Sequence, residues 1–144
     1  MAGSLLIVDD EKEICEMLSR NFRMLGYSVK TASNGIEALD LLAKAPVDVV
    51  ISDIMMPKMD GVSLLREVRS QYPMTHVVMI TGYVTLENAL ACMRLQADTC
   101  VFKPLHDLTE LESAVSDALK ALDLWKHKFH ELQGMKPQST GNAQ

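Results

Sequence analysis

Short apolar segments of this chain end in side chains that could do chemistry together. Two segments end in carboxylates, one ends in a hydroxyl and one ends in an ammonium group. If the segments are strands of one open parallel sheet, their carboxyl ends lie along the edge where such sheets bind ligands. The pattern therefore predicts a polar site at that edge, built from Asp9, Asp10, Asp53, Thr81 and Lys103.

Three carboxylates held close together repel one another, and a divalent cation relieves that repulsion best. Mg²⁺ typically takes one or two carboxylates, together with waters and phosphate oxygens. A remaining carboxylate can then act as a nucleophile and accept a phosphoryl group, while a lysine neutralises the charge on the transferred oxygens. Asp10 also suits a helix cap, but Asp53 is followed by Ile54-Met55-Met56-Pro57 and has no helix to cap. The residue types therefore indicate Mg²⁺ and phosphoryl chemistry.

The elements that must position these side chains follow from apolar runs bounded by turn residues and from helical spacing. Each expected strand is followed by an expected helix, so the chain reads as five βα units with a buried parallel sheet. The strands are expected at 5–8, 28–32, 47–51, 77–80 and 99–102, and the helices at 11–25, 35–45, 61–71, 86–96 and 108–133.

Polar residues mark the helix starts. Three pairs have the spacing of a capping box, in which a cap residue is followed three positions later by Glu. These are Asp10 with Glu13, Asn34 with Glu37, and Asp107 with Glu110; Asp60 and Thr85 are the expected caps of the other two helices.

Length and composition bound the possible functions. The chain has 144 residues, 48% of them hydrophobic and 23% charged, which fits one globular domain. Its 14 basic and 19 acidic residues give a net charge of −5, which argues against direct nucleic-acid binding. Neither a membrane span nor a signal peptide is visible, so we expect a cytoplasmic protein. The three cysteines show no CxxC spacing, and we expect reduced thiols.

The site residues stand in a recognisable set of motifs. Their order and spacing resemble the receiver domain of two-component response regulators, over about residues 4 to 124. The resemblance implies a doubly wound α/β sheet of strand order 2-1-3-4-5 and a phosphoryl group supplied by a sensor histidine kinase or a histidine phosphotransfer protein. The motifs are Asp9-Asp10-Glu11, Ser52-Asp53 with Pro57 and Asp60-Gly61, Thr81-Gly82, and Lys103-Pro104.

The resemblance also implies a role for each site residue. Asp53 matches the phosphoacceptor; Asp10 and Asp53 match direct Mg²⁺ ligands, and Asp9 matches a ligand that acts through water. Met55 matches the position that offers Mg²⁺ a backbone carbonyl. Thr81 and Lys103 match the hydroxyl and the ammonium that bind the new phosphoryl group. The Lys103-Pro104 bond is usually cis in this family.

Two positions depart from the family pattern. An aromatic residue usually stands three positions before the lysine and rotates with the threonine, but this chain has Cys100 there, so the switch is expected to be altered. The turn before the last strand is often Gly-Ala and here reads Gln96-Ala97, which predicts for Gln96 a backbone conformation that suits glycine better.

The interpretation that follows is a signalling switch that phosphorylates and dephosphorylates itself but acts on no separate substrate. One alternative is a phosphohydrolase with an aspartate nucleophile, although such enzymes place the nucleophile after the first strand in an Asp-x-Asp pattern. Another is an interaction module with a vestigial acidic pocket, against which the complete set of site residues counts.

The last helix is too long for a receiver, since it reaches roughly 40 Å if it runs without a break to residue 133. An apolar stripe with heptad spacing continues along it, through Leu108, Leu111, Val115, Ala118, Leu122, Trp125, Phe129 and Leu132. The helix could fold back or fray; otherwise its end projects. We expect a receiver over 1–124, a helical extension over 125–134 and a flexible tail or linker over 135–144. The stripe, with the face of the fourth and fifth helices, suggests a homodimer; the alternative is that the helix continues into an effector domain as a signalling helix.

Overall fold

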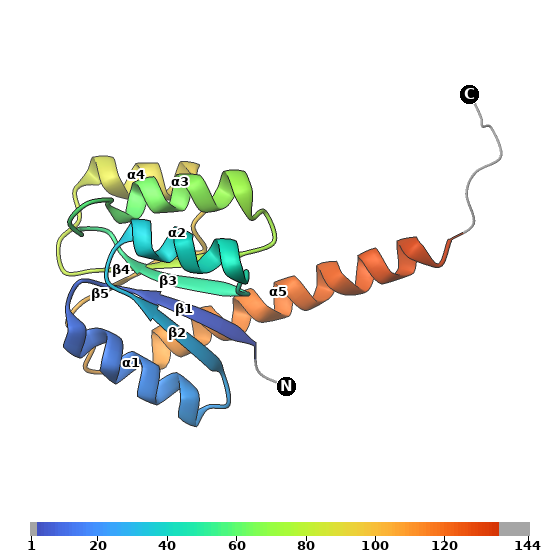
Figure 1. Ribbon diagram of the computed structural model, residues 1–144, viewed down its shortest axis with the longest axis horizontal. Coiled ribbons are helices and arrows are strands. Elements are labelled where there is room, and N and C mark those ends of the chain that lie inside the picture. Colours follow the sequence, from blue (N-terminus) through green and yellow to red (C-terminus); the bar gives the residue numbers. More distant parts are fainter. Residues whose placement is uncertain (1–2, 136–144) are drawn as a thin grey trace.

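The computed structural model describes residues 3–135, and the predicted tail at 135–144 lies outside them except for Met135. Five parallel strands form one sheet in the order β2-β1-β3-β4-β5, which confirms the predicted fold (Figure 1). The strands are β1 (Ser4–Val8), β2 (Ser28–Ala32), β3 (Val49–Asp53), β4 (His76–Thr81) and β5 (Thr99–Phe102). The helices are α1 (Lys12–Met24), α2 (Gly35–Lys44), α3 (Gly61–Gln71), α4 (Leu86–Arg94) and α5 (Thr109–Gln133).

Helices cover both faces of the sheet, with α1 and α5 on one side and α2, α3 and α4 on the other (Figure 1). Two apolar clusters result, one on each face. Leu5 and Ile7 of β1 pack toward α1 and α5, whereas Leu6 and Val8 pack toward α2 and α3. Because both faces are buried, the central strands are continuously apolar. This two-sided core fixes where every strand ends, and therefore where the polar edge lies.

The third strand begins and ends two residues later than predicted, at 49–53 in place of 47–51. Asp53 is still part of β3 and pairs with Ile80 of β4. The apolar run stops at Ile51, but the strand continues. Ser52 still pairs with both β1 and β4, and Asp53 pairs with β4. A carboxylate at the last ladder position is held more rigidly than one in a loop.

Three of the five predicted helix caps are confirmed. Asn34, Asp60 and Thr85 accept hydrogen bonds from the backbone N–H groups three residues later. The two caps predicted at Asp10 and Asp107 are wrong.

Each of these two helices begins later than predicted. The helix α1 starts after Glu11, which leaves the Asp10 carboxylate free at the sheet edge. Asp107 instead accepts from the backbone N–H of Thr109 at 2.9 Å and from its hydroxyl at 2.6 Å, which forms a turn before α5.

Gln96 has a φ of 62°, as predicted from the missing glycine in the turn before β5. Its backbone N–H donates to the carbonyl of Met93, and the next N–H, of Ala97, donates to the carbonyl of Cys92. A left-handed residue at the end of α4 thus satisfies the last carbonyls of the helix.

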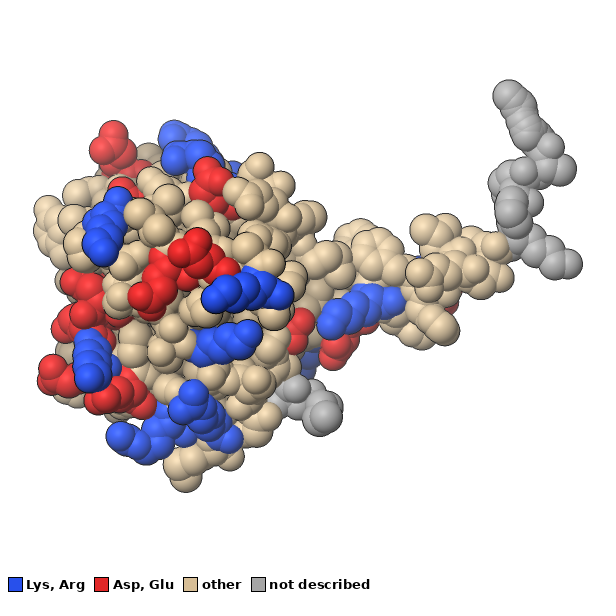
Figure 2. Space-filling model, in the orientation of Figure 1, with Lys and Arg blue, Asp and Glu red and all other residues tan. Residues whose placement is uncertain are grey.

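The helix α5 continues unbroken to Gln133, so it neither folds back nor frays (Figure 1). Its first half buries Leu111, Val115, Ala118 and Leu122 against the sheet. Its second half projects from the domain and carries much uncharged surface (Figure 2), and Lys126 still pairs with Asp48 at 3.6 Å. Trp125 and Leu132 are there 57% and 63% exposed. Within residues 3–135, no helix combines the length and apolar composition needed to cross a membrane.

Candidate functional site

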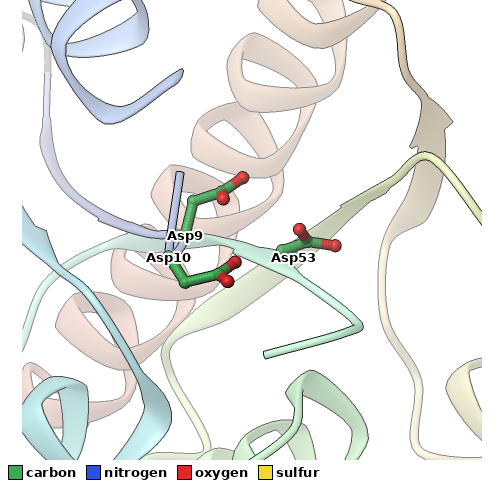
Figure 3. Close-up of side chains that lie close together, drawn as sticks. All are labelled: Asp9, Asp10 and Asp53. Carbon is green, nitrogen blue, oxygen red and sulfur yellow. The ribbon is translucent and has the colours of Figure 1, made fainter. Parts of the chain in front are cut away.

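Three carboxylates meet at the carboxyl edge of the sheet. Asp9 and Asp10 follow β1, and Asp53 ends the neighbouring strand β3, so the three side chains converge on one space (Figure 3). One carboxylate oxygen from each lies within 4.8 Å of the other two. The structure therefore brings together the acids that the strand ends predicted.

Asp53 is held on both of its oxygens. Its side chain is almost fully buried, and Oδ1 accepts the backbone N–H of Met55 at 3.3 Å. Oδ2 accepts a hydrogen bond from Lys103 Nζ at 2.9 Å. The main chain of Met55 thus lies against the carboxylate, while the Met55 side chain is exposed.

Asp9 is the most buried of the three acids. Oδ1 accepts the backbone N–H of Glu11 at 2.8 Å. Oδ2 lies 3.0 Å from Lys103 Nζ, but it accepts no well-oriented hydrogen bond from the described residues. Burial raises the pKa of Asp9, although the Glu11 N–H and Lys103 oppose the shift. A buried carboxylate oxygen without a hydrogen bond is an acceptor in need of a donor or a cation.

The lysine is surrounded by carboxylates. Lys103 Nζ lies 2.6 Å from Glu11 Oε1, 2.9 Å from Asp53 Oδ2 and 3.0 Å from Asp9 Oδ2. Burial alone would lower the pKa of Lys103, but its contacts with Glu11, Asp53 and Asp9 outweigh burial and raise it. The ammonium is therefore charged at any physiological pH. The Lys103–Pro104 bond is cis, as the resemblance implied.

The hydroxyl of Thr81 is buried and engaged within its own loop. Oγ1 donates to the carbonyl of Tyr83 at 2.7 Å and accepts the Tyr83 backbone N–H at 3.2 Å. Within residues 3–135 no hydrogen bond joins it to Asp53 or Lys103. The carbonyl of Thr81, however, accepts the backbone N–H of Lys103 at 2.8 Å, so the two strand ends are tied side by side.

Glu11 is the site residue that the sequence did not single out. It directly follows Asp9-Asp10 and makes the shortest of the lysine's three contacts, from a position 92 residues away in the chain. The only signal for it in the sequence was an acid next to two others. Its side chain remains 59% exposed, so it stands at the mouth of the site.

Cys100 lies half-buried on β5, beside Met79 of β4, and faces α4. Burial raises the pKa of its thiol to about 11. The thiol is therefore neutral under physiological conditions and acts as a small apolar side chain.

The donor set fits Mg²⁺. Carboxylate oxygens are the ligands that this ion prefers, and it usually keeps several waters, which an open and partly exposed site allows. Asp10 is exposed at the rim, whereas Asp9 offers a buried oxygen with no hydrogen bond. These residues could hold the cation directly or through water.

Curated relatives are longer than this chain. Regulatory protein AtoC of Escherichia coli (strain K12) is 40% identical over 131 residues, which cover 91% of this chain and 28% of the relative. A probable transcriptional regulator, ycf27, of Cyanidium caldarium is 34% identical and is matched over 96% of this chain and 55% of its own length. The chain thus spans between about a quarter and about half of the length of these two relatives.

Solved structures match the fold closely. A response regulator receiver domain protein from Clostridium thermocellum has 31% identity and a TM-score of 0.80, covering 87% of this chain and 99% of that one. The response regulator protein TrrA from Thermotoga maritima, in complex with Mg²⁺-BeF, has 32% identity and a TM-score of 0.73, covering 82% and 99%. The sequence model of the family described as "Response regulator receiver domain" matches residues 5–116 of this chain. With its sheet order and its acidic pocket, this chain belongs to the response regulator receiver domain family.

Proposed function

We propose that this receiver accepts a phosphoryl group on Asp53, from a sensor histidine kinase or a histidine phosphotransfer protein, and uses it as a signal. The observation that carries the proposal is the position of the Asp53 carboxylate. It is buried, contacted by Lys103 at 2.9 Å and grouped with two further acids within 4.8 Å. A capping or purely structural role would require none of these contacts.

In the proposed reaction a carboxylate oxygen of Asp53 attacks the phosphorus of a phosphohistidine. The new O–P bond forms as the P–N bond to the histidine breaks, and the imidazole leaves with the bonding electrons. Lys103 neutralises negative charge on the transferred oxygens. Mg²⁺, when bound, supplies further neutralisation and a template for the phosphoryl oxygens. Later hydrolysis of the acyl phosphate by water returns the carboxylate.

The roles of the other site residues belong to the same proposal. Asp10 and Asp53 would hold Mg²⁺ directly, Asp9 would hold it through water, and Met55 would offer its backbone carbonyl. Thr81 would exchange its hydrogen bond to the Tyr83 carbonyl for one to the phosphoryl group. That exchange would move the loop between β4 and α4, because the present bond defines the loop.

The output of this switch is binding to a partner. We propose that phosphorylation shifts the surface of α4, β5 and α5, since coupling between two sites of this kind is commonly worth about 1–3 kcal/mol. The net charge of −5 supports a protein partner over nucleic acid. The kinase partner implies action in the cytoplasm.

Treatment with a small phosphodonor or with beryllofluoride, each with and without Mg²⁺, tests the function. We expect a covalent phosphate in the intact mass and beryllofluoride binding only when Mg²⁺ is present. Turnover of a separate phosphoester substrate would favour an enzyme, and a complete lack of response would favour an inert module.

Coupling to α4 is predicted to rest on Thr81 and not on position 100. Cys100→Ala should leave the phosphorylation-induced amide NMR shifts of α4 nearly unchanged, since a neutral thiol is too small to act as a rotating gate. Thr81→Ala should reduce them to less than about half, because the hydroxyl provides the bond that is exchanged. Tyr83, which is 68% exposed, could supply part of the missing aromatic role. The opposite ranking of the two variants would refute this account.

We also propose that residues 125–134 form an extension through which two copies pair, together with the α4 and α5 face. Trp125 and Phe129 stack with ring centroids 5.8 Å apart, and they are 57% and 43% exposed. With Leu132 they continue the stripe that the sheet buries in the first half of α5. A second copy of the same helix offers a matching apolar stripe. Three such contacts alone are marginal in water, so the receiver face must contribute.

Sedimentation of the full chain and of a version ending at Leu124, each with and without beryllofluoride, tests this pairing. We expect the full chain to dimerise at least about tenfold more tightly with beryllofluoride, and the shorter version to stay monomeric. Trp125→Ala should weaken the dimer, whereas His127→Ala, at the position of the heptad farthest from the stripe, should not. Monomers in all four samples would rule out the dimer.

A further inference from the structure

Glu11 holds the lysine of the site from the solvent side. Its Oε1 lies 2.6 Å from Lys103 Nζ, closer than either aspartate. The Glu11 side chain is 59% exposed, whereas those of Asp9 and Asp53 are 0% and 6% exposed. Glu11 is thus the one solvent-exposed partner among the three.

Three carboxylate oxygens crowd the ammonium of Lys103. Its Nζ donates hydrogen bonds to Glu11 Oε1 and Asp53 Oδ2, and Asp9 Oδ2 lies 3.0 Å away as an ion pair without a well-oriented hydrogen bond. A phosphoryl oxygen that approaches Lys103 therefore competes with these carboxylates for the ammonium. Asp53 is the proposed acceptor of the group, and Asp9 is fixed by the backbone N–H of Glu11 at 2.8 Å. Only the Glu11 carboxylate can turn outward into water without leaving a buried charge unpaired.

We propose that Glu11 is a positioning residue that occupies the place of the phosphoryl oxygen on Lys103 in the resting state and must be exchanged for it. This inference rests on the proposed phosphoacceptor role of Asp53. The exchange makes the lysine contact a two-state element: Lys103 pairs with Glu11 at rest and with the phosphoryl group after transfer.

The charge of Glu11 also opposes phosphate uptake. Asp9, Asp53 and Glu11 lie within 3.0 Å of the Lys103 ammonium, and Asp10 adds a fourth carboxylate beside Asp9 and Asp53. A phosphoryl donor is itself an anion, so a carboxylate at the mouth repels it as well as competing for the lysine. Both effects make Glu11 slow the uptake of phosphate.

Two variants weaken the competition of Glu11 for Lys103 to different extents. Glu11→Gln removes the charge but keeps a weaker, neutral acceptor, and Glu11→Ala removes the acceptor as well. The side chain of Glu11 accepts no capping hydrogen bond from the described residues, so neither variant takes a side-chain cap away from α1. The matched control is Glu13→Gln, an exposed acid in the first turn of α1 that makes no contact with Lys103.

The measured quantities are the rate of phosphate uptake from a small phosphodonor and the dissociation constant of beryllofluoride, both at saturating Mg²⁺. We expect Glu11→Gln to raise the rate and tighten beryllofluoride binding by roughly two- to fivefold, the range of a half-exposed ion pair. Glu11→Ala should exceed Glu11→Gln, and Glu13→Gln should match the parent. The NMR signal of the Lys103 ammonium should show faster hydrogen exchange in both Glu11 variants before phosphate is added.

The possible outcomes distinguish a failure of the Glu11 exchange from a failure of the proposed phosphoryl transfer to Asp53. If the parent and all variants take up no phosphate, the proposed function fails and the inference fails with it. If all take up phosphate at one rate, or the Glu11 variants are slower, Asp53 remains the acceptor and the exchange is refuted. An equal gain in Glu13→Gln would also refute it, because general charge would then explain the effect.

Discussion

Replacing Asp53 by Asn is expected to abolish covalent phosphate uptake entirely. Asn has nearly the same shape as Asp, so the side chain can still lie in its buried place at the end of β3. It lacks the anionic oxygen that would attack phosphorus, and its amide weakens the contact with Lys103. Intact mass after phosphodonor treatment with Mg²⁺ measures the result. We expect no adduct on the variant and a single adduct on the parent.

The control for charge is Asp40→Asn, at an exposed position on α2 outside the acidic pocket. It should take up phosphate like the parent. Loss of uptake in Asp53→Asn will not reflect unfolding, since removing one of three clustered carboxylates relieves repulsion and should leave the melting temperature equal or higher. An undiminished adduct on Asp53→Asn would exclude Asp53 as the acceptor.

Gly61→Ala is expected to cause the largest loss of stability of any single methyl addition described for this chain. A Cβ at position 61 would overlap the backbone carbonyl of Asp53 and approach the Cα of Ile54 to 2.8 Å. The backbone N–H of Gly61 also donates to the Ile54 carbonyl at 2.8 Å, so the two segments cannot separate without losing that bond. We expect a loss of about 3 kcal/mol or more, the upper range for overpacking.

Thermal or denaturant unfolding measures this loss, and a fall in melting temperature of roughly 10 °C or more corresponds to it. Gly134→Ala is the matched control, because the nearest atom to its added Cβ is the Glu131 carbonyl oxygen at 3.5 Å. Its stability should change by less than about 1 kcal/mol. Equal stability of Gly61→Ala and the parent would show that the loop after Asp53 can move, against the packing described above.

The polar site at the sheet edge was predictable because the end of each strand can be recognised from its local sequence. Four of the five expected strands end within two residues of a residue of the site, and parallel topology then brings these residues to one edge. Asp9, Asp10 and Asp53 can be grouped in this way from the sequence alone. The sheet order itself came from the resemblance to a family, since apolar runs do not specify which strands are neighbours.

What could not be predicted depends on contacts between distant segments. Asp10 and Glu13 have capping-box spacing, yet α1 begins after Glu11, where the sheet edge sets the chain direction. The contact between Glu11 and Lys103 joins residues 92 positions apart, and no local pattern encodes it. The orientation of the Thr81 hydroxyl depends on the loop carbonyl of Tyr83, which propensities do not specify.

The unbroken α5 amplifies small tilts of its buried half. Leu122 is the last buried residue of this helix and Gln133 is its end, so about 16 Å of helix extends beyond Leu122, where an ion pair, between Lys126 and Asp48 at 3.6 Å, ties it to the domain. A tilt of the buried half by about 10° would displace the far end by roughly 3 Å, at the rise per residue of an α-helix. Angular changes too small to alter the packing of the sheet therefore become displacements of atomic size at Gln133, where whatever is attached or bound can register them.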